Sequence, residues 1–588
     1  MTSLMTQPQI LATAAIDASA IGSVIDEATA AAACPTTNIA AAAADEVSTI
    51  TAQFFAEFGE ECQTLLQQAA AFHNQFVATL AAAGNAYATA EADIAEALGL
   101  TGGTQSEPLF GPVAKGAGNT NVVANLIMTG SGTATPSTAY LNGVYSRYLS
   151  GTYGGGGPFI GPLQAVTTAE GLYPFTGVKD LTLDISLARG VTALDNAINL
   201  AIRPGSTDSV SILGYSQSAI VASLEMQQLR AEGFTNGTGG TPVQAYFNLL
   251  GDPANPNGGL LSRFPGLSFP SLGVTFGAAT PSNDYPTTIW TIEYDGFADF
   301  PRYPINILAD LNALAGIVFL HGTYPYLTDA ALSTAFQLPQ SGAPSMTTYN
   351  MIPTENLPLL TPLRAIPLIG TPLADLVQPD LKALVNWGYG DPNYGFSTSP
   401  ADVPTPFGFL PPLSATIALG PLLVSGTQQG VSDFFRDLSA LSPQSLSELP
   451  LSSLINVLPE AATGGVALPA PGAIPSTING VIAGLELAND NFVNTVTSDI
   501  STAYATLLPT ADIGTALLLS LPAYDIKLFL NGISEVVNGN IIGGLLDAFG
   551  DPIAASVGLI ALGIGFEFVT LDNAFETIVF GVPNPGPY

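Results

Sequence analysis

The segment that most restricts the fold of this 588-residue chain is an apolar run that ends in Gly-Tyr-Ser-Gln-Ser, residues 214–218. Residues 210–213 have the composition of a buried strand, and residues 219–229 follow as an amphipathic helical stretch. A serine in the sharp turn between a strand and a helix needs small residues two places before and after it. Gly214 and Ser218 meet that need, although the usual second glycine is a serine. The segment predicts a nucleophile elbow with Ser216 at its tip, and therefore an α/β fold.

A second segment, Gly-Phe-Ser-Thr-Ser at 395–399, matches the same pattern around Ser397. With 61 glycines in the chain, such a match is expected on the order of once by chance. Ser397 has no strand or helix pattern around it and is followed by Pro400. We therefore interpret Ser397 as a chance match and Ser216 as the nucleophile. The alternative for Ser216 is an ordinary tight turn.

A serine hydroxyl needs a neighbouring base to become nucleophilic, and histidine is the usual base at neutral pH. The chain has 2 histidines, His73 and His321. His73 lies within an N-terminal helical pattern, so Ser-His chemistry must use His321, which follows apolar residues 313–320. The alternative is that His321 is a hydrogen-bonded loop residue without a catalytic role.

The third member of such a site is a carboxylate at a strand end, between the serine and the histidine in the chain. Residues 288–294 have the pattern of this strand and lead into Asp295 and Asp299. We favour Asp299, because a residue beyond the turn can reach back to His321, whereas Asp295 precedes a glycine and could be only a turn former. Asp252, at the end of the preceding predicted strand, is a third candidate.

Acyl transfer also needs backbone N–H donors for the oxyanion. Gln217 begins the predicted elbow helix, and Gly130 stands in a Gly-Ser-Gly-Thr loop after a short apolar strand at 122–128. We expect the N–H of Gln217 and one from the Gly130 loop to act as these donors. No Gly-Lys-Ser/Thr follows the loop, which excludes a P-loop. The separated histidines and cysteines supply no metal-ligand cluster, and we expect no cofactor.

The charge balance excludes one large class of partner. Lys and Arg total 12 against 46 Asp and Glu, and the resulting formal charge of −34 repels the phosphates of nucleic acids. No basic residue precedes Lys115, so ordinary signal-peptide export is not indicated. Prolines interrupt the uncharged run at 403–432, and we predict no transmembrane helix.

Two helices are expected within residues 1–98. The first, within 9–33, ends before Pro35, and the second keeps apolar residues at helical spacing from Val47 to Leu80. Two helices alone cannot cover so long an apolar stripe. Either another part of this chain or a helical partner must therefore cover it.

Five different short motifs lie in this predicted hairpin. They are Pro8-Gln9, Ile21-Gly22-Ser23, Pro35-Thr36-Thr37, Ala44-Asp45-Glu46-Val47-Ser48 and Ala71-Phe72-His73. Together they resemble the PE domain of mycobacterial PE proteins, with Pro-Gln in place of the namesake Pro-Glu. Tyr87 and Glu91, which fall on one helix face, match the Tyr-x-x-x-Asp/Glu signal of type VII secretion substrates. The resemblance implies export by a type VII system to the cell wall or surface, and a PPE-type partner or secretion chaperone on the hairpin.

Residues 99–120 are rich in Gly and Pro and indicate a linker, after which a second set of motifs begins. These are Gly130-Ser131-Gly132-Thr133, Pro136-Ser137, Gly214-Tyr215-Ser216-Gln217-Ser218, Asn255-Pro256-Asn257-Gly258-Gly259, Tyr294-Asp295-Gly296, Asp299-Phe300-Pro301 and Asn386-Trp387-Gly388-Tyr389-Gly390-Asp391. They resemble the PE-PPE domain over residues 121–410. The resemblance implies an α/β-hydrolase fold, similar to that of cutinases and lipid esterases, which acts on acyl esters without a cofactor.

Residues 411–588 show no alternation of strand and helix patterns and are apolar. We expect them to be helical, either as a cap over the site or as a surface attachment. For the whole chain we expect an exported serine esterase that hydrolyses short or medium acyl esters, including lipids, through an acyl-enzyme. The same residues would serve an acyltransferase on envelope glycolipids. A surface interaction protein with an inert hydrolase fold is the third interpretation.

Overall fold

The computed structural model describes two compact units, residues 1–107 and 108–588. The described residues are 110–113, 119–154, 156–202, 208–233, 244–440, 493–499, 501–503 and 505–580, with the single residues Ala33, Thr37, Ala52, Ala56, Gln63 and Asp490. Apart from Ala33, Thr37, Ala52, Ala56 and Gln63, the predicted N-terminal hairpin lies outside the described residues, and so do His73, Tyr87 and Glu91.

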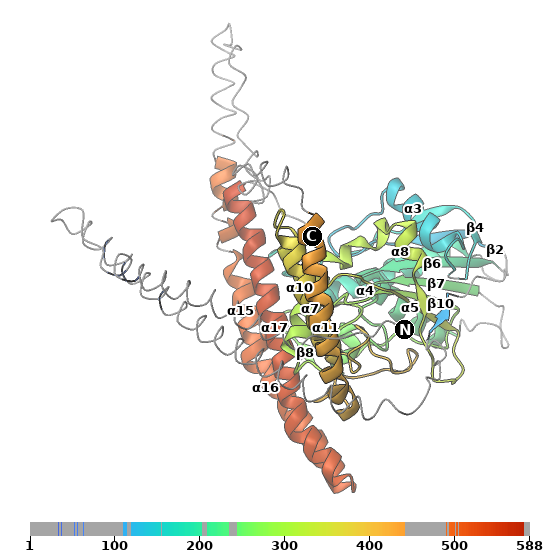
Figure 1. Cartoon of the computed structure of the whole chain (residues 1–588). Helices are drawn as coiled ribbons and strands as arrows, with labels where there is room; N and C mark the ends of the chain where they lie inside the picture. The colour runs from blue at the N-terminus through green and yellow to red at the C-terminus, as the bar shows by residue number, and fades with distance from the viewer. Residues whose placement is uncertain are drawn as a thin grey trace, which may run out of the picture. The chain divides into compact units, whose positions relative to one another are not determined.

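An eight-stranded sheet forms the centre of the second unit, in the order β1-β11-β12-β10-β7-β6-β3-β5 (Figure 1). In that order the strands are Gly111–Pro112, Phe336–Gln337, Thr347–Ile352, Thr287–Ile292, Gln244–Leu250, Ser209–Tyr215, Ala124–Ile127 and Leu163–Ala165. Neighbours from β12 to β5 pair in parallel, while β11 pairs antiparallel with both β12 and β1. Two small ribbons join β2 (Thr120–Asn121) to β4 (Phe159–Ile160) and β8 (Ser268–Phe269) to β9 (Val274–Thr275).

The central strands are buried on both faces. Leu126 and Ile212 belong to one apolar cluster, and the next residues along each strand, Ile127 and Leu213, belong to another. Because successive side chains of a strand point to opposite faces, helices must cover both sides of the sheet. The mixed α/β fold with a mostly parallel sheet is consistent with the predicted hydrolase domain.

The register brings the carboxyl ends of four strands together. Ile127 of β3 pairs with Leu213 of β6, and Leu250 of β7 pairs with both Tyr215 of β6 and Trp290 of β10. The loops that follow these strands therefore begin side by side, at the edge where α/β sheets place their sites.

Two helices hold the site residues. α5 (Gln217–Ala231) starts directly after the elbow and packs on β6 and on α4 (Leu183–Ala201). α7 (Ile307–Phe319) leads into the 3-10 turn η2 (His321–Tyr326), which places His321 at a helix end. The remaining elements of this part are α3 (Thr138–Val144), η1 (Tyr145–Leu149), α6 (Leu260–Arg263), α8 (Asp329–Ser333), η3 (Pro358–Leu360), α9 (Thr361–Arg364), α10 (Gly370–Trp387) and α11 (Leu413–Ala440).

The described part of the C-terminal region is helical, as its composition predicts. Its main elements are α15 (Leu507–Thr515), η5 (Ala516–Ser520), α16 (Leu521–Val537) and α17 (Ile541–Phe580). α16 and α17 pack along each other, and α17 contacts α7. Ala516 and Leu559 belong to the same buried cluster as Leu126 of the sheet. These helices therefore share the core of the hydrolase part.

Three described stretches are long and apolar enough to cross a membrane by length and composition alone: Ile307–Tyr326, Val493–Val537 and Ile541–Ile578. The prediction of no transmembrane helix was argued from the proline-interrupted run at 403–432 and did not consider these three stretches, so it stays a prediction. Ile307–Tyr326 includes His321 and packs on the rest of the fold, with 44% of its most apolar window buried.

Candidate active site

Ser216 occupies the turn between β6 and α5. Its backbone has φ 58° and ψ −120°, a strained conformation for a residue with a side chain. The turn leaves no room at Gly214, where a Cβ would lie 2.4 Å from the carbonyl oxygen of Ser218. The Ser218 hydroxyl accepts from the Tyr215 N–H at 2.9 Å and donates to the Tyr215 carbonyl at 3.1 Å. The predicted strand, elbow and helix are present, and the serine that replaces the second glycine bonds across the turn.

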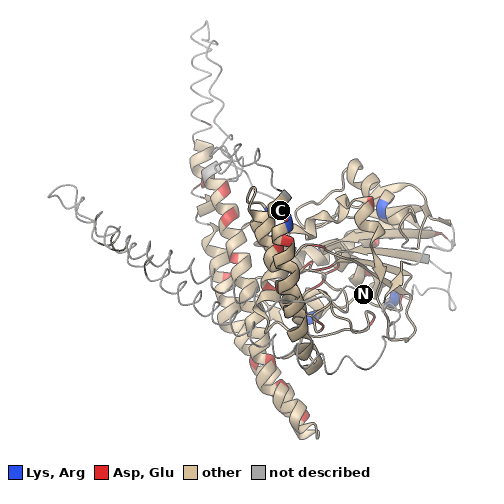
Figure 2. Ribbon diagram, in the orientation of Figure 1, with Lys and Arg blue, Asp and Glu red and all other residues tan. Residues whose placement is uncertain are grey.

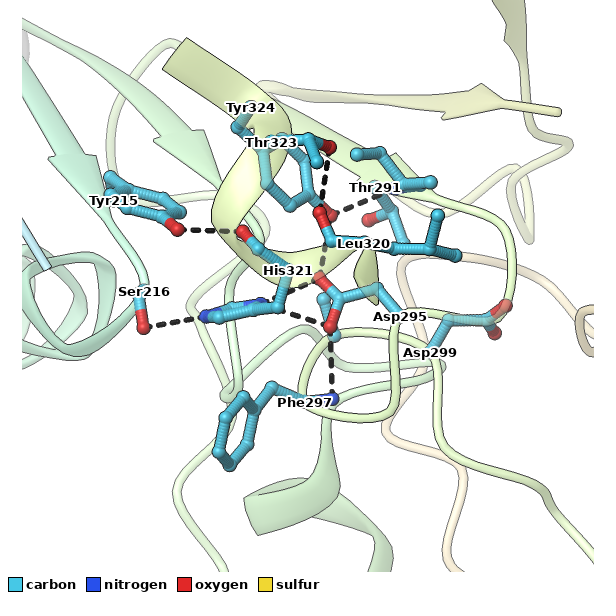
Figure 3. Close-up of polar contacts among 12 residues, drawn as sticks. Tyr215, Ser216, Thr291, Asp295, Phe297, Asp299, Leu320, His321, Thr323 and Tyr324 are labelled. Carbon is cyan, nitrogen blue, oxygen red and sulfur yellow. Dashed lines mark hydrogen bonds and ion pairs between the residues drawn. The ribbon is translucent and has the colours of Figure 1, made fainter. Parts of the chain in front are cut away.

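His321 connects Ser216 to Asp295 (Figure 3). The imidazole Nε2 lies 2.7 Å from Ser216 Oγ, and Nδ1 lies 2.9 and 2.8 Å from the two carboxylate oxygens of Asp295. Because a carboxylate only accepts hydrogen bonds, Nδ1 carries the proton and Nε2 accepts from the serine hydroxyl. All three side chains are buried. This arrangement allows a base to take the proton of a nucleophile.

The preference for Asp299 as the acid is corrected by this geometry, since Asp295 is the carboxylate that meets His321. Asp299 Oδ2 accepts from the Tyr294 N–H at 3.0 Å, and its carboxylate points away from the imidazole (Figure 3). Burial raises the pKa of Asp299 well above its usual range, while the Tyr294 N–H and the Arg263 charge act in the opposite direction. Asp299 is thus a buried structural carboxyl.

Two other sequence candidates have hydrogen-bond partners other than His321. Asp252 accepts from the Ala254 N–H at 2.9 Å and from the Thr280 hydroxyl, and burial raises its pKa to about 6. Ser397 lies in a loop, where its carbonyl accepts from Asn257 Nδ2 at 3.3 Å. His321 contacts Ser216 rather than Ser397.

Three aromatic residues that the sequence did not single out surround the imidazole. The Tyr324 hydroxyl donates to Asp295 Oδ2 at 2.8 Å, and the Tyr215 hydroxyl donates to the His321 carbonyl at 2.6 Å. The Phe297 ring meets the imidazole edge-on, with centroids 4.8 Å apart. Burial and the nearby Asp295 charge raise the pKa of Tyr324 well above its usual range, so its hydroxyl remains a donor. Tyr215 lies within the elbow motif, but nothing in the sequence pairs it with His321.

The Gly130 loop lies against the nucleophile. A Cβ at Gly130 would be 3.0 Å from Ser216 Cβ. The Ser131 hydroxyl donates to Gln217 Oε1 at 2.9 Å, and Gln217 Nε2 donates to the Ala169 carbonyl at 2.9 Å. Within the described residues, the backbone N–H groups of Gly130, Ser131 and Gln217 donate to no protein acceptor. These groups are free to bind an oxyanion beside Ser216.

A buried carboxyl supports that loop from behind. The Glu170 carbonyl accepts from the Gly132 N–H at 2.7 Å. The Glu170 side chain accepts from the Thr168 hydroxyl through Oε1, while Oε2 has no partner among the described residues. Burial raises the pKa of Glu170 to about 8, against the lowering effect of the Thr168 bond.

Two chambers meet at Ser216. The apolar chamber encloses about 1000 Å³ including its open mouth, and no charged residue lines it. The polar chamber has about 1240 Å³ including its mouth, and half of its lining residues carry hydroxyl groups, among them Thr133, Thr135, Ser137, Tyr140 and Tyr326. His321 lines the polar chamber only. In the part of the chain described, no group of three or more His, Cys, Asp or Glu is placed to hold a metal ion.

A mostly parallel α/β sheet, with an elbow serine bonded in series to histidine and aspartate at its carboxyl edge, is consistent with the class of α/β hydrolases. The chain belongs to the PE family and carries a PE-PPE domain. The PE family model matches residues 4–94, and the PE-PPE domain model matches residues 162–390. The second span includes Ser216, Asp295 and His321 and begins after the Gly130 loop.

Several proteins of Mycobacterium tuberculosis are similar to this chain. Esterase PE16 is 44% identical over 414 residues, which are 70% of this chain and 73% of the relative. PE family protein PE3 is 44% identical over 463 residues, 78% of this chain and 92% of the relative. The uncharacterized PPE family protein PPE28 is 46% identical over 453 residues, 77% and 66% of the two chains. No solved structure matches the chain.

Proposed function

We propose that this protein is an exported serine esterase in which Ser216 is the nucleophile, His321 the base and Asp295 the residue that orients the imidazole. The PE-PPE domain and the relative named Esterase PE16 support a lipolytic or esterase function. The observation that carries the finer proposal is the hydrogen-bonded series from Ser216 Oγ through His321 to Asp295.

The proposed reaction has two halves. Ser216 Oγ attacks the ester carbonyl carbon while its proton moves to His321 Nε2. The N–H of Gln217 and one from the Gly130 loop stabilise the tetrahedral oxyanion. Each such donor typically lowers the activation barrier by ~3 kcal/mol. The ester C–O bond then breaks, and His321 returns the proton to the leaving alcohol. Water repeats the sequence on the acyl-enzyme and releases the acid.

A fluorophosphonate probe tests this assignment. We expect the wild-type protein to be labelled on Ser216, and the Ser216→Ala variant to lose both labelling and ester hydrolysis. The Ser397→Ala variant is the matched control, since Ser397 stands in the same sequence pattern, and it should retain both. Absence of labelling of the folded wild-type protein would instead support a non-catalytic interaction protein.

Acyl transfer is a second candidate function, and the hydroxyl-rich polar chamber favours it. A chamber with this lining suits a polyhydroxylated alcohol next to His321. The alcohol would replace water as the acceptor of the acyl group. Mass spectrometry of products formed with an acyl ester and trehalose distinguishes the two: an acylated sugar indicates transfer, and free acid alone indicates hydrolysis.

PE family proteins are generally type VII secreted mycobacterial proteins, and family membership implies a PPE-type partner in general. For this chain we propose Tyr87 and Glu91 as the export signal, and a PPE-type protein or secretion chaperone on the hairpin. The Tyr87→Ala variant, expressed in a mycobacterium, should remain in the cell lysate, while the Ser216→Ala variant reaches the cell wall like the wild type. Export of Tyr87→Ala at the wild-type level would rule out this signal.

A further inference from the structure

The C-terminal helices form one wall of the apolar chamber. The chamber residues contributed by α15, η5 and α17 include Ile513, Ala516, Leu517, Leu559, Leu562 and Phe566. The opposite wall comes from the hydrolase part, through residues such as Leu172, Phe175, Ile220, Leu260, Phe276 and Phe297. The chamber therefore exists only where the two parts of the unit meet.

Specific contacts hold the helical wall in place. The Tyr173 hydroxyl donates to Asp512 Oδ2 at 2.7 Å, and the Ser271 hydroxyl donates to the Asp512 carbonyl at 2.8 Å. The Phe566 ring lies 6.0 Å from the ring of Phe175. These contacts tie α15 and α17 to loops on the opposite side of the chamber.

One residue links this wall to the catalytic imidazole. The Phe297 ring lies 6.4 Å from the Phe566 ring and also meets the edge of His321. Its backbone N–H donates to Asp295 Oδ1 at 3.1 Å. The chamber wall and the proposed triad are therefore in direct contact.

Few of the residues that line the apolar chamber are polar. Ser131, Ser216 and Gln217, at the elbow and its loop, contribute polar groups, and Tyr173 is the other lining residue with a hydroxyl. The rest of the lining is aliphatic, aromatic, proline or glycine. An ester placed with its carbonyl at Ser216 can therefore extend an alkyl chain into the chamber, with no polar group required along that chain.

We propose that the apolar chamber binds a long acyl chain, and that the C-terminal helices determine the acyl-chain length of the substrate. The proposal rests on the proposed esterase function and extends it beyond short and medium esters. The lining extends from Ser216 to Ile513, Leu559 and Phe566 of the C-terminal helices. An acetyl or butyryl group at Ser216 would leave most of this lining without contacts. A long chain fills the chamber and removes its own apolar surface from water.

Ala516 offers a direct test, because its side chain is 2% exposed and lines the chamber. For the wild type, kcat/KM on p-nitrophenyl esters should rise from acetate to hexadecanoate, by up to about fourfold per buried methylene. The Ala516→Phe variant should lower the ratio of hexadecanoate to acetate kcat/KM by at least about tenfold, because its ring occupies the space of several methylenes. Taking the ratio within one preparation cancels any loss of folded protein.

Leu518 is the matched control, since it lies two residues further along η5 and is 76% exposed. The Leu518→Phe variant should keep the wild-type ratio. A wild-type rate that falls steadily with chain length, or an equal effect of Ala516→Phe on all esters, would overturn the proposal and leave the esterase assignment standing.

Binding can be measured without catalysis. The Ser216→Ala variant should bind cis-parinarate, a fluorescent long-chain fatty acid, with enhanced emission, and the Ser216→Ala/Ala516→Phe double variant should bind it at least about tenfold more weakly. If the wild type hydrolyses no ester but Ser216→Ala binds cis-parinarate in this way, the proposed esterase function is contradicted and the proposed binding of an acyl chain in the chamber is supported. If Ser216→Ala and Ser216→Ala/Ala516→Phe bind cis-parinarate with equal affinity, the chamber proposal is wrong.

Discussion

At the scale of single residues, Asp295 combines two roles that the sequence presents as alternatives. Its Oδ1 accepts from the Phe297 N–H, as a turn-forming aspartate does, while both of its oxygens lie within 2.9 Å of His321 Nδ1. A carboxylate has about four lone-pair sites, so one side chain can satisfy the turn and the imidazole together. Gly296, which favours a turn at Asp295, therefore does not exclude Asp295 from the site.

Substitution of Asp295 and of Asp299, one at a time, distinguishes the two candidate acids. The Asp295→Asn variant should lower kcat for ester hydrolysis by about 10³- to 10⁴-fold, because the amide no longer fixes the imidazole tautomer. The Asp299→Asn variant should retain kcat within about tenfold but lower Tm, because the buried Arg263 loses a nearby carboxyl. Steady-state kinetics and thermal unfolding of both proteins provide the comparison. The reverse order of kcat losses would restore Asp299 as the acid.

At the scale of elements, the Gly130 loop is held by hydrogen bonds from two sides. α5 holds Gln217, whose side chain joins Ser131 to Ala169. On the other side, the Glu170 carbonyl fixes the Gly132 N–H. The loop therefore keeps its shape through contacts that are distant in the sequence, which a local motif does not reveal.

Glu170 predicts a pH dependence of stability. Its pKa rises from 4.5 to about 8 in the folded protein, so the fold favours the protonated carboxyl. As the pH rises from 4.5 to about 8, the unfolded chain ionises first and the free energy of unfolding falls. The Glu170→Gln variant keeps the oxygen that accepts from Thr168 and removes this loss. Its Tm should therefore fall less than the wild-type Tm between these pH values, by at least about 2 °C.

The exposed Glu232 supplies the control for this measurement. The Glu232→Gln variant should follow the wild-type Tm at every pH. Parallel pH profiles for Glu170→Gln and the wild type would show that Glu170 does not ionise differently in the folded and unfolded states.

At the scale of the whole molecule, the C-terminal elements η5, α16 and α17 share the buried core of the α/β sheet. Gly558 of α17 lies so close to α7 and the segment before it that a Cβ there would be 2.6 Å from Pro304 Cβ. Charged residues are sparse along α16 and α17, and most of their visible length is uncharged (Figure 2). Apolar packing, supported by a few polar contacts such as Tyr173 to Asp512, therefore holds these helices in place.

Two glycine substitutions test this docking. The Gly558→Leu variant should separate α17 from the hydrolase part, lower Tm by at least about 2 °C and speed proteolysis at the junction. Gly514 of α15 has no atom within 4 Å of an added Cβ, so Gly514→Leu should leave Tm unchanged or raise it, since glycine is unfavourable within a helix. Equal Tm values for the two variants would contradict the packing described.

The sequence by itself determined the strand, turn and helix around Ser216 and most of the candidate site. The strand that ends in Gly214 and the helix that follows it are local patterns, so the elbow and Ser216 could be predicted. His321 followed from the scarcity of histidine, because 2 residues left a single choice outside the predicted N-terminal helices. These inferences needed only short-range periodicity, turn stereochemistry and counting.

The tertiary structure decided what depends on distance between segments far apart in the chain. Asp295 and Asp299 are separated by four positions, and only the fold of the turn shows which carboxylate faces His321. The chamber beside Ser216 likewise forms from residues near 175, 260 and 560 that no local pattern connects. Side-chain direction and long-range packing are properties of the folded chain, and the choice of acid and the depth of the apolar chamber follow from them.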